Sequence, residues 1–147
     1  MGADNEKELS LKLFVVLTRA LDSITSKIKD DIRGYGLNPT EFAVLELLYH
    51  KGEQPIQKIG DKVLLASSSI TYVVDKLEKK GYIKRKPCPT DRRVTYAVIT
   101  ELGQTLMDEI FPKHMDAIND ICAGLNVDEK KLLIEMLKKL GLFAKSI

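Results

Sequence analysis

The first third of the chain carries apolar residues at helical spacing. Between residues 6 and 33 they recur every three or four residues, at Leu9, Leu13, Val16, Ala20, Ile24, Ile28 and Ile32. This spacing predicts one long helix that ends at the sequence "RGYG". Further apolar positions, Leu11, Phe14, Val15 and Leu21, lie off this stripe. The amino-terminal half is therefore apolar over much of its circumference, as in a helix packed between two partners.

A second helix is predicted to begin at "NPTE", residues 38–41. Asn38 suits the N-cap, Pro39 suits the first helical position, and Glu41 stands three residues after the cap, which completes a capping box. The helix is expected to reach about Lys51, where "KGEQ" ends it.

Two short helices follow. Pro55 opens the first, with Ile56, Ile59 and Val63 on one face, and "LLASSS" leads into the next. The next helix has apolar residues at Ile70, Val73, Val74 and Leu77 and a polar face of Ser68, Thr71, Tyr72, Asp75, Lys76 and Lys79. Ser67 is its predicted N-cap and "KKGY" its glycine C-cap. Such a pair, with hydroxyls and amines on the second helix, is typical of a helix-turn-helix.

A β-hairpin is predicted next. "YIKRK" alternates apolar and basic residues, "PCPTDRR" contains the turn, and "VTYAVIT" returns with β-branched and aromatic residues. Pro87 and Pro89 fit a loop or an edge strand.

The carboxy-terminal part of the chain predicts two more helices. Thr100 suits the N-cap of the first, and Pro112 is expected to kink or divide it near Phe111. "NVDE" at 126–129 caps the last helix, whose apolar positions are Leu132, Leu133, Met136, Leu137, Leu140 and Phe143. Both chain ends therefore carry more apolar surface than one small domain needs. A two-fold dimer would bury it, although the same stripes could instead pack on their own chain.

Composition and charge narrow the function. The chain has 147 residues, 44% hydrophobic and 30% charged, which indicates one folded unit. The net charge is only +2, yet residues 56–100 hold ten Lys or Arg against four acids, a local charge of +6. A basic segment between acidic ends is typical of contact with a polyanion, but a solvated basic surface gives the same count.

Other classes of function find little support in the residues. Cys88 and Cys122 have no metal-ligand or disulfide spacing, and no apolar run or leader suggests a membrane span or a signal peptide. We therefore expect a cytoplasmic protein with no cofactor and no metal. His50 and His114 lack partners for a catalytic triad, so an enzyme is not expected.

Together these motifs resemble the MarR family of bacterial winged helix-turn-helix transcription regulators. The segment "SSSITYVVDKLEKKGYIKR" is similar to the family's recognition helix and first wing strand, and "DRRVTYAVITELG" to its wing signature. The resemblance implies a mainly α fold with a small β-wing (α+β). Residues 1–36 and 101–147 would form dimerisation helices around a DNA-binding domain at 37–100.

The resemblance and the polar pattern predict a DNA interface. The expected residues are Ser67, Ser68, Ser69, Thr71, Tyr72, Lys76, Arg85, Lys86, Asp91, Arg92 and Arg93. Arg93 matches the family's minor-groove arginine, and Asp91 is expected to orient it by a charge-assisted hydrogen bond. In the alternative, "DRR" is a solvated turn with a weak surface ion pair.

The resemblance also implies a homodimeric repressor of a pseudo-palindromic operator, released by a small, often aromatic effector. Phe14, His50, Phe111 and Met115 are the candidate effector contacts, although such residues often belong to a plain core. An activator, a regulator without a ligand, and a winged-helix protein-interaction module stay open as alternatives.

Overall fold

The computed structural model describes residues 2–63 and 69–147. Its helices and strands follow the predicted order with one addition, the short strand β1. The elements are α1 (Gly2–Arg33), α2 (Pro39–Lys51), β1 (Gln54–Pro55), α3 (Ile56–Ile59), α4 (Ile70–Lys79), β2 (Ile83–Pro87), β3 (Thr95–Ile99), α5 (Glu101–Ile121) and α6 (Val127–Ser146).

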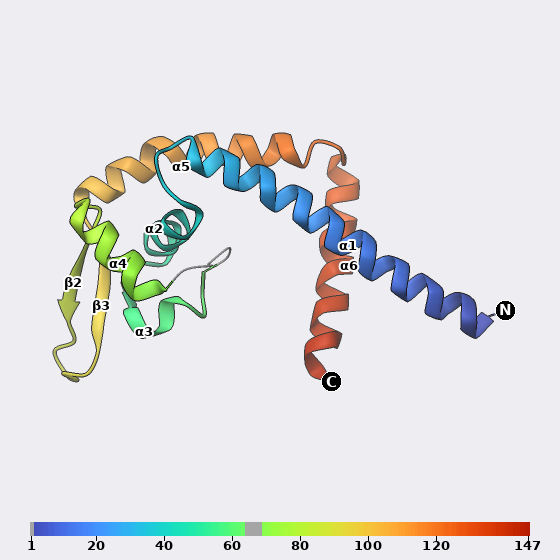
Figure 1. Cartoon of the computed structure of the whole chain (residues 1–147), viewed down its shortest axis with the longest axis horizontal. Coiled ribbons are helices and arrows are strands. Elements are labelled where there is room, and N and C mark those ends of the chain that lie inside the picture. The colour runs from blue at the N-terminus through green and yellow to red at the C-terminus, as the bar shows by residue number, and fades with distance from the viewer. Residues whose placement is uncertain (1, 64–68) are drawn as a thin grey trace.

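The elements form a winged unit with long helices attached to it. In Figure 1, α2, α3, α4 and the β2–β3 hairpin gather at one end, while α1 and α5 run beside each other above them. The amino-terminal half of α1 and all of α6 extend away from this unit. The predicted mainly α architecture with a β-wing is confirmed.

Three antiparallel strands make up the sheet, in the order β1-β3-β2. The hairpin pairs Ile83 with Ile99 at its base and Pro87 with Thr95 toward its tip. Pro87 ends β2, which is an edge strand, so the sheet loses no hydrogen bond through the missing N–H of proline. On the other side, β1 adds two residues to β3, with Gln54 opposite Ala97.

One core lies where α2, α4, α5 and the sheet meet. Phe42, Leu45 and Leu48 of α2 pack with Val74 and Leu77 of α4 in a single buried cluster. The buried side of α4 is therefore the apolar stripe that the sequence predicts. No described residue of α6 is buried.

Local capping motifs set the helix ends. Asn38 Oδ1 accepts from Glu41 N at 2.8 Å, and Glu41 Oε1 accepts from Asn38 N at 2.9 Å. Asn126 and Glu129 make the same reciprocal pair at the start of α6. These two capping boxes, and the one-sided cap of α5 by Thr100, confirm the predicted helix starts.

The end of α4 is a Schellman motif rather than a glycine at the C-cap itself. Lys80 is the C-cap, and Gly81 follows it with φ of +85°. Gly81 N donates to Glu78 O at 3.0 Å and Tyr82 N donates to Leu77 O at 3.1 Å. Glycine suits this position because a side chain is strained at such a φ.

Several sequence predictions need correction. Pro112 does not divide α5, which runs unbroken from Glu101 to Ile121, although its path bends part-way along in Figure 1. The N-cap position of α4 is Ser69, and Ser67 lies outside the described residues. α3 ends at Ile59, so Val63 is not part of it.

A buried ion pair ties α2 to the end of α4. The Glu41 side chain is 2% exposed, and its Oε2 accepts from Lys80 Nζ at 2.7 Å. Burial by itself raises the pKa of Glu41, but the hydrogen bonds from Lys80 and from the Asn38 backbone outweigh it and hold the pKa below the ordinary 4.5. The carboxylate is thus stabilised in the folded protein only while its partners are present.

Lys80→Met is expected to lower the free energy of unfolding at pH 7 by about 2 kcal/mol, because it leaves a buried carboxylate unpaired. The wild type gains stability from the lowered pKa of Glu41 above pH 4.5 and loses it as the pH falls through the folded-state pKa. In the variant, burial raises that pKa and protonation relieves the penalty. Urea unfolding at pH 7 and pH 4 should therefore show the gap narrowing in acid; an equal gap at both would contradict the assignment.

Candidate nucleic-acid interface

The outer side of α4 is polar and open to solvent. Val73, Val74 and Leu77 are buried beneath it. On the outer side Thr71 is exposed and Tyr72 is 63% exposed. The helix can therefore present this side to another molecule without disturbing the core.

The predicted contacts on and before α4 lie as follows. Ser69 is exposed at the N-cap and its side chain makes no capping hydrogen bond. Lys76 is half-buried. Ser67 and Ser68 lie outside the described residues. Of the predicted contacts, Ser69, Thr71 and Tyr72 thus share the first turn and its cap, where amides and hydroxyls can bind phosphate or base edges.

The wing tip holds Arg93 in a fixed turn. Its side chain is 91% exposed, and Asp91 Oδ1 accepts from Arg93 N at 3.0 Å and from Arg93 Nε at 3.2 Å. The bond from the Arg93 backbone, and to a smaller extent the bond from its side chain, hold the pKa of Asp91 below its ordinary value. The predicted hydrogen bond between the two is present. Arg92 is exposed beside them, with no core to pack against.

Two side-chain contacts join the wing to the segments before it. Gln57 Nε2 of α3 donates to Arg93 O at 3.1 Å. Lys86 Nζ lies 3.3 Å from Glu53 Oε2, just before β1. Both contacts are exposed. Lys86 can therefore leave the Glu53 carboxylate and bind a phosphate at little cost in free energy.

Arg85, one of the predicted DNA contacts, lies against α4. Its guanidinium turns toward α4, where Nη1 donates to Glu78 Oε1 at 2.6 Å and Nη2 donates to Asp75 Oδ1. Strand alternation puts Lys84 and Lys86 on the other face of β2, and both are exposed. Of the three basic residues of β2, Lys84 and Lys86 therefore face solvent and Arg85 faces α4.

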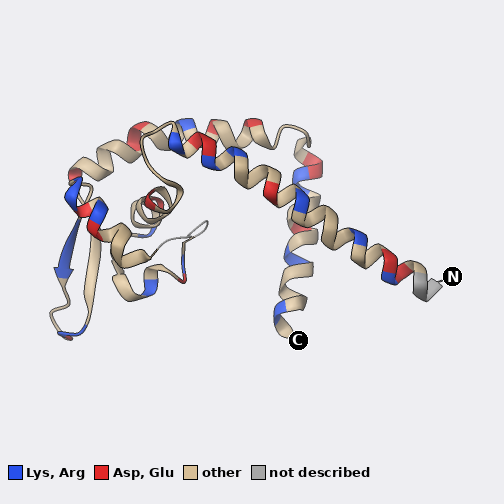
Figure 2. Ribbon diagram, viewed as in Figure 1, with Lys and Arg blue, Asp and Glu red and all other residues tan. Residues whose placement is uncertain are grey.

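Basic residues concentrate on the wing. Figure 2 shows them along β2 and at the wing tip, whereas α1, α4, α5 and α6 carry both signs of charge. The local +6 of residues 56–100 therefore maps onto the winged unit. This distribution is typical of a surface that binds a polyanion.

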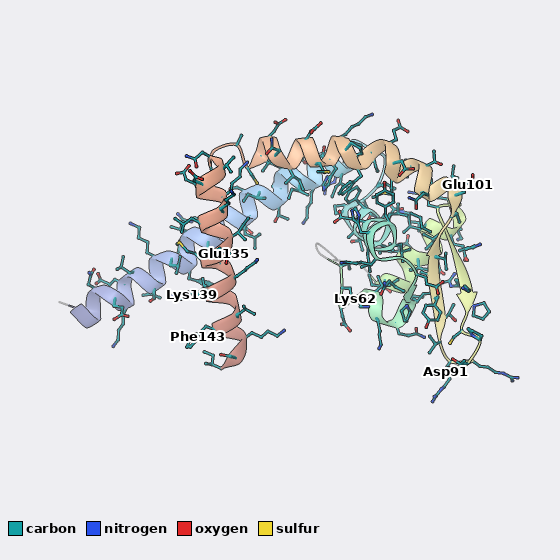
Figure 3. All side chains as sticks on the ribbon, turned by 180° about the vertical axis from the view of Figure 1, so that it is seen from behind. Lys62, Asp91, Glu101, Glu135, Lys139 and Phe143 are labelled. Atoms are coloured by element: carbon teal, nitrogen blue, oxygen red, sulfur yellow. The ribbon has the colours of Figure 1, made fainter. Side chains whose placement is uncertain are left out.

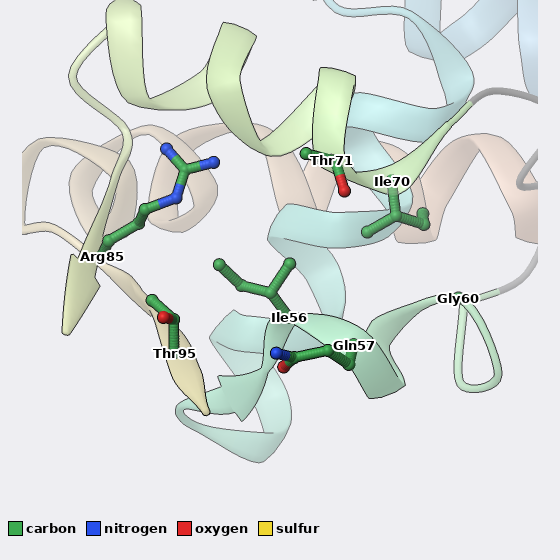
Figure 4. Close-up of a pocket in the computed structure, with 7 residues that line it drawn as sticks. All are labelled: Ile56, Gln57, Gly60, Ile70, Thr71, Arg85 and Thr95. Carbon is green, nitrogen blue, oxygen red and sulfur yellow. The ribbon is translucent and has the colours of Figure 1, made fainter. Parts of the chain in front are cut away.

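A hollow of 360 Å³ lies between α3, the start of α4 and the wing. Figure 4 shows its lining, with Arg85 directed from β2 toward the helix and Thr71 on the opposite side. The lining residues are Ile56, Gln57, Gly60, Ile70, Thr71, Arg85 and Thr95. The recognition helix and the wing are therefore separated by open space at this point.

A second hollow, of 500 Å³, lies among α1, α2 and α5. It is walled mainly by apolar side chains such as Ile24, Phe42 and Leu47, with His50 at one side. The other ionisable residues that line the hollow are Glu46, Lys51, Lys62 and His114.

Of the four candidate effector contacts, only His50 lines this hollow. Phe14 and Met115 are exposed, and Phe111 packs its ring 4.5 Å from the His50 ring, centroid to centroid. Helical spacing identifies apolar faces but does not show which of them meet around a cavity.

His114 lines this hollow and pairs with Asp31 of α1, a partner that the sequence does not reveal. His114 is buried, its Nδ1 lies 2.8 Å from Asp31 Oδ2, and its ring packs 4.5 Å from that of Phe42, centroid to centroid. Tyr35 Oη donates to Asp31 Oδ1 at 2.8 Å, and burial, then this bond, raises the pKa of Tyr35 to about 12. No sequence signal connects residues so far apart.

No three His, Cys, Asp or Glu side chains come together as a metal site within residues 5–63 and 69–147. The same part of the chain has no helix with an apolar stretch that could cross a bilayer.

Comparison with known proteins identifies the family. The model of the MarR family matches residues 37–95. The HTH-type transcriptional regulator MhqR of Bacillus subtilis (strain 168) is 59% identical over 138 residues, which cover 94% of this chain and 95% of that protein. The chain belongs to the MarR family.

Two MarR-type structures show the same fold at lower identity. Sco3205 of Streptomyces coelicolor, a MarR family regulator solved in complex with DNA, superposes with a TM-score of 0.76 at 20% identity, over 93% of this chain and 86% of that one. BpsR of Bordetella bronchiseptica, whose structure concerns regulation of DNA binding by 6-hydroxynicotinic acid, gives 0.76 at 21%, over 88% and 98%.

The family and the geometry agree on the general activity. This MarR-family chain is a DNA-binding transcription regulator and not an enzyme.

Proposed function

We propose that the protein is a homodimeric, sequence-specific repressor that occupies a pseudo-palindromic operator in the bacterial cytoplasm and is released by a small, aromatic ligand. The observation that supports the proposal is that one unit holds both the open side of α4 and the exposed Asp91–Arg93 wing tip, which are the two elements proposed to face DNA.

DNA reading divides between these elements. The first turn of α4, with Ser69, Thr71 and Tyr72, is suited to base edges in the major groove. Arg92 and Arg93 are suited to the narrow minor groove, whose negative potential attracts guanidinium groups. Lys76 and Lys86 supply phosphate contacts that add affinity without sequence preference.

The long helices supply the dimer. Residues 1–36 and 101–147 carry large apolar side chains that nothing in the single chain covers, among them Leu11, Phe14 and Phe143. Figure 3 shows α6, with Lys139 and Phe143 labelled, standing clear of the winged unit. A two-fold pairing of these helices would place two recognition helices about 34 Å apart, one turn of duplex.

The 500 Å³ hollow is the proposed effector site. Its apolar walls suit a flat ring, and His50, Glu46 and His114 offer polar contacts within it. It lies where α1 and α5, the helices assigned to the dimer, meet α2 of the winged unit. A ligand that binds better when the recognition helices are wrongly spaced would lower operator occupancy.

Arg93→Ala is expected to weaken operator binding about tenfold or more per wing and to reduce the salt slope of log K by about one per protomer. The side chain packs on no core, so folding is unaffected. Fluorescence anisotropy across a salt series measures this, on a duplex selected by the wild type from a random pool and on a scrambled duplex. Lys113→Ala, an equal charge change at an exposed site of α5, is the control.

Two results would contradict the proposal. Either the wild type selects no sequence from the pool, or Arg93→Ala binds like Lys113→Ala at every salt concentration. In both cases a protein-interaction role for the winged unit becomes the better interpretation, because such a module has no use for the wing arginines.

A further inference from the structure

Arg85 joins β2 of the wing to α4, the two elements proposed above to face DNA. It stands at the middle of β2, and its two Nη atoms bind carboxylates of Asp75 and Glu78, which lie three residues apart on α4. A guanidinium held by two acceptors is fixed in orientation as well as in distance, because its donors form a rigid planar fork.

We propose that Arg85 is a positioning residue that aligns the wing with the recognition helix, and that Asp75 and Glu78 withhold its charge from DNA phosphates. The inference rests on the DNA-binding function proposed above and concerns how the two reading elements act together.

The hollow beside this bridge explains why alignment is needed. The later turns of α4 share the buried core with the strands, but between Thr71 at the start of α4 and Thr95 of β3 the 360 Å³ space is open, so apolar packing does not set the distance between them. Arg85 reaches from the strand toward the helix at this space (Figure 4). The tie between Gln57 and Arg93 O holds the wing to α3 but not to α4.

Charge explains the second half of the proposal. Asp75, Glu78 and Arg85 together sum to −1. A phosphate that approaches Arg85 therefore meets the repulsion of two carboxylates, which already neutralise the guanidinium and occupy one donor on each of its Nη atoms. Lys84 and Lys86, on the opposite face of the same strand, carry no such restriction, since Lys86 has one exposed partner.

Withholding one arginine affects discrimination between DNA sequences. Phosphate contacts strengthen binding to every duplex, whereas groove contacts strengthen binding to the operator alone. A wing held at a fixed angle adds Arg93 to the operator contacts without a further ordering cost. The bridge should therefore raise the ratio of operator affinity to random-sequence affinity.

The first test frees Arg85. Asp75→Asn with Glu78→Gln is expected to bind a scrambled duplex more tightly than the wild type, with a salt slope steeper by about 0.9 per protomer, which is one additional phosphate. Removing two acids also lowers general repulsion. The triple variant that adds Arg85→Gln separates the causes, because a gain that comes from the freed arginine disappears in it.

The second test measures coupling between the bridge and the wing tip. On the duplex selected by the wild type, Arg93→Ala should cost about tenfold per wing in the wild-type background and less than about threefold per wing in an Arg85→Lys background. Lysine keeps the charge but cannot bridge two carboxylates in a fixed geometry, so this variant isolates alignment from charge. Thermal unfolding checks that every variant is folded.

The outcomes are distinct. If Arg93→Ala costs the same factor in both backgrounds, the alignment role is wrong. If Arg85→Gln alone reduces the salt slope by about one, or the triple variant keeps the gain on scrambled DNA, the withholding role is wrong. Failure of the wild type to select any sequence contradicts the proposed function instead, and the scrambled-duplex slopes still decide whether Arg85 contacts phosphate.

Discussion

Gly103→Ala is expected to destabilise the protein by about 3 kcal/mol or more, and so to leave little folded protein near physiological temperature. A Cβ atom at this position would lie 2.2 Å from Tyr82 O and 2.8 Å from Ile99 Cγ1. The closer atom belongs to the backbone and cannot rotate away. Tyr82 O is also fixed by the hydrogen bond that it accepts from Thr100 N at 3.0 Å, so the start of α5 would have to leave the wing.

Gly124→Ala is the matched control. An added Cβ there meets nothing within 4 Å, and the change has the same effect on the unfolded chain. Its free energy of unfolding should stay within about 0.5 kcal/mol of the wild type. Urea unfolding followed by circular dichroism measures both variants. Equal stabilities for the two would show that α5 and the wing do not pack as closely as described.

Features built from neighbouring residues were predictable from the sequence. The capping boxes at Asn38 and Asn126 join residues three apart, and the Thr100 cap and the hairpin are similarly local. The apolar stripe of α4 and its polar outer side follow from helical period alone. These features place the recognition helix and the wing tip, which is most of the proposed DNA surface.

Features that depend on distant partners were not predictable. β1 is two residues long and includes Pro55, so it carries no alternation of its own, and its pairing with Tyr96 and Ala97 belongs to the tertiary fold. The alternation of side chains along β2 puts Arg85 on the other face from Lys84 and Lys86. It does not reveal that Asp75 and Glu78 of α4 lie against Arg85. The sequence therefore marks Arg85 as basic, but the carboxylates that it binds follow only from the tertiary fold.

The residues around the 500 Å³ hollow also depend on partners that are distant in the sequence. His114 and Asp31 meet across 83 residues of sequence, and nothing local to either residue marks the other. Phe14 is a candidate effector contact through the family resemblance alone, and it lies on the exposed side of α1. Helix packing angles, which a one-dimensional pattern does not contain, decide such questions.

Leu140→Glu combined with Phe143→Glu is expected to convert the protein to a monomer and to weaken operator binding by about 100-fold or more, because two linked half-site contacts become one. Both side chains are exposed in the single chain, at 40% and 67%, so the chain's own fold loses little. In a dimer formed through α6, the change would bury four carboxylates, which cannot stay charged there without partners.

Lys138→Glu changes the net charge by the same amount on the opposite side of α6, where the side chain is 65% exposed and makes only a surface pair with Glu135. This control should remain dimeric and bind the operator as the wild type does. Sedimentation equilibrium at micromolar protein gives the assembly state, and anisotropy on the selected duplex gives the affinity. A double variant that still sediments as a dimer would move the interface away from this face, and a monomeric wild type would remove the two-fold operator model altogether.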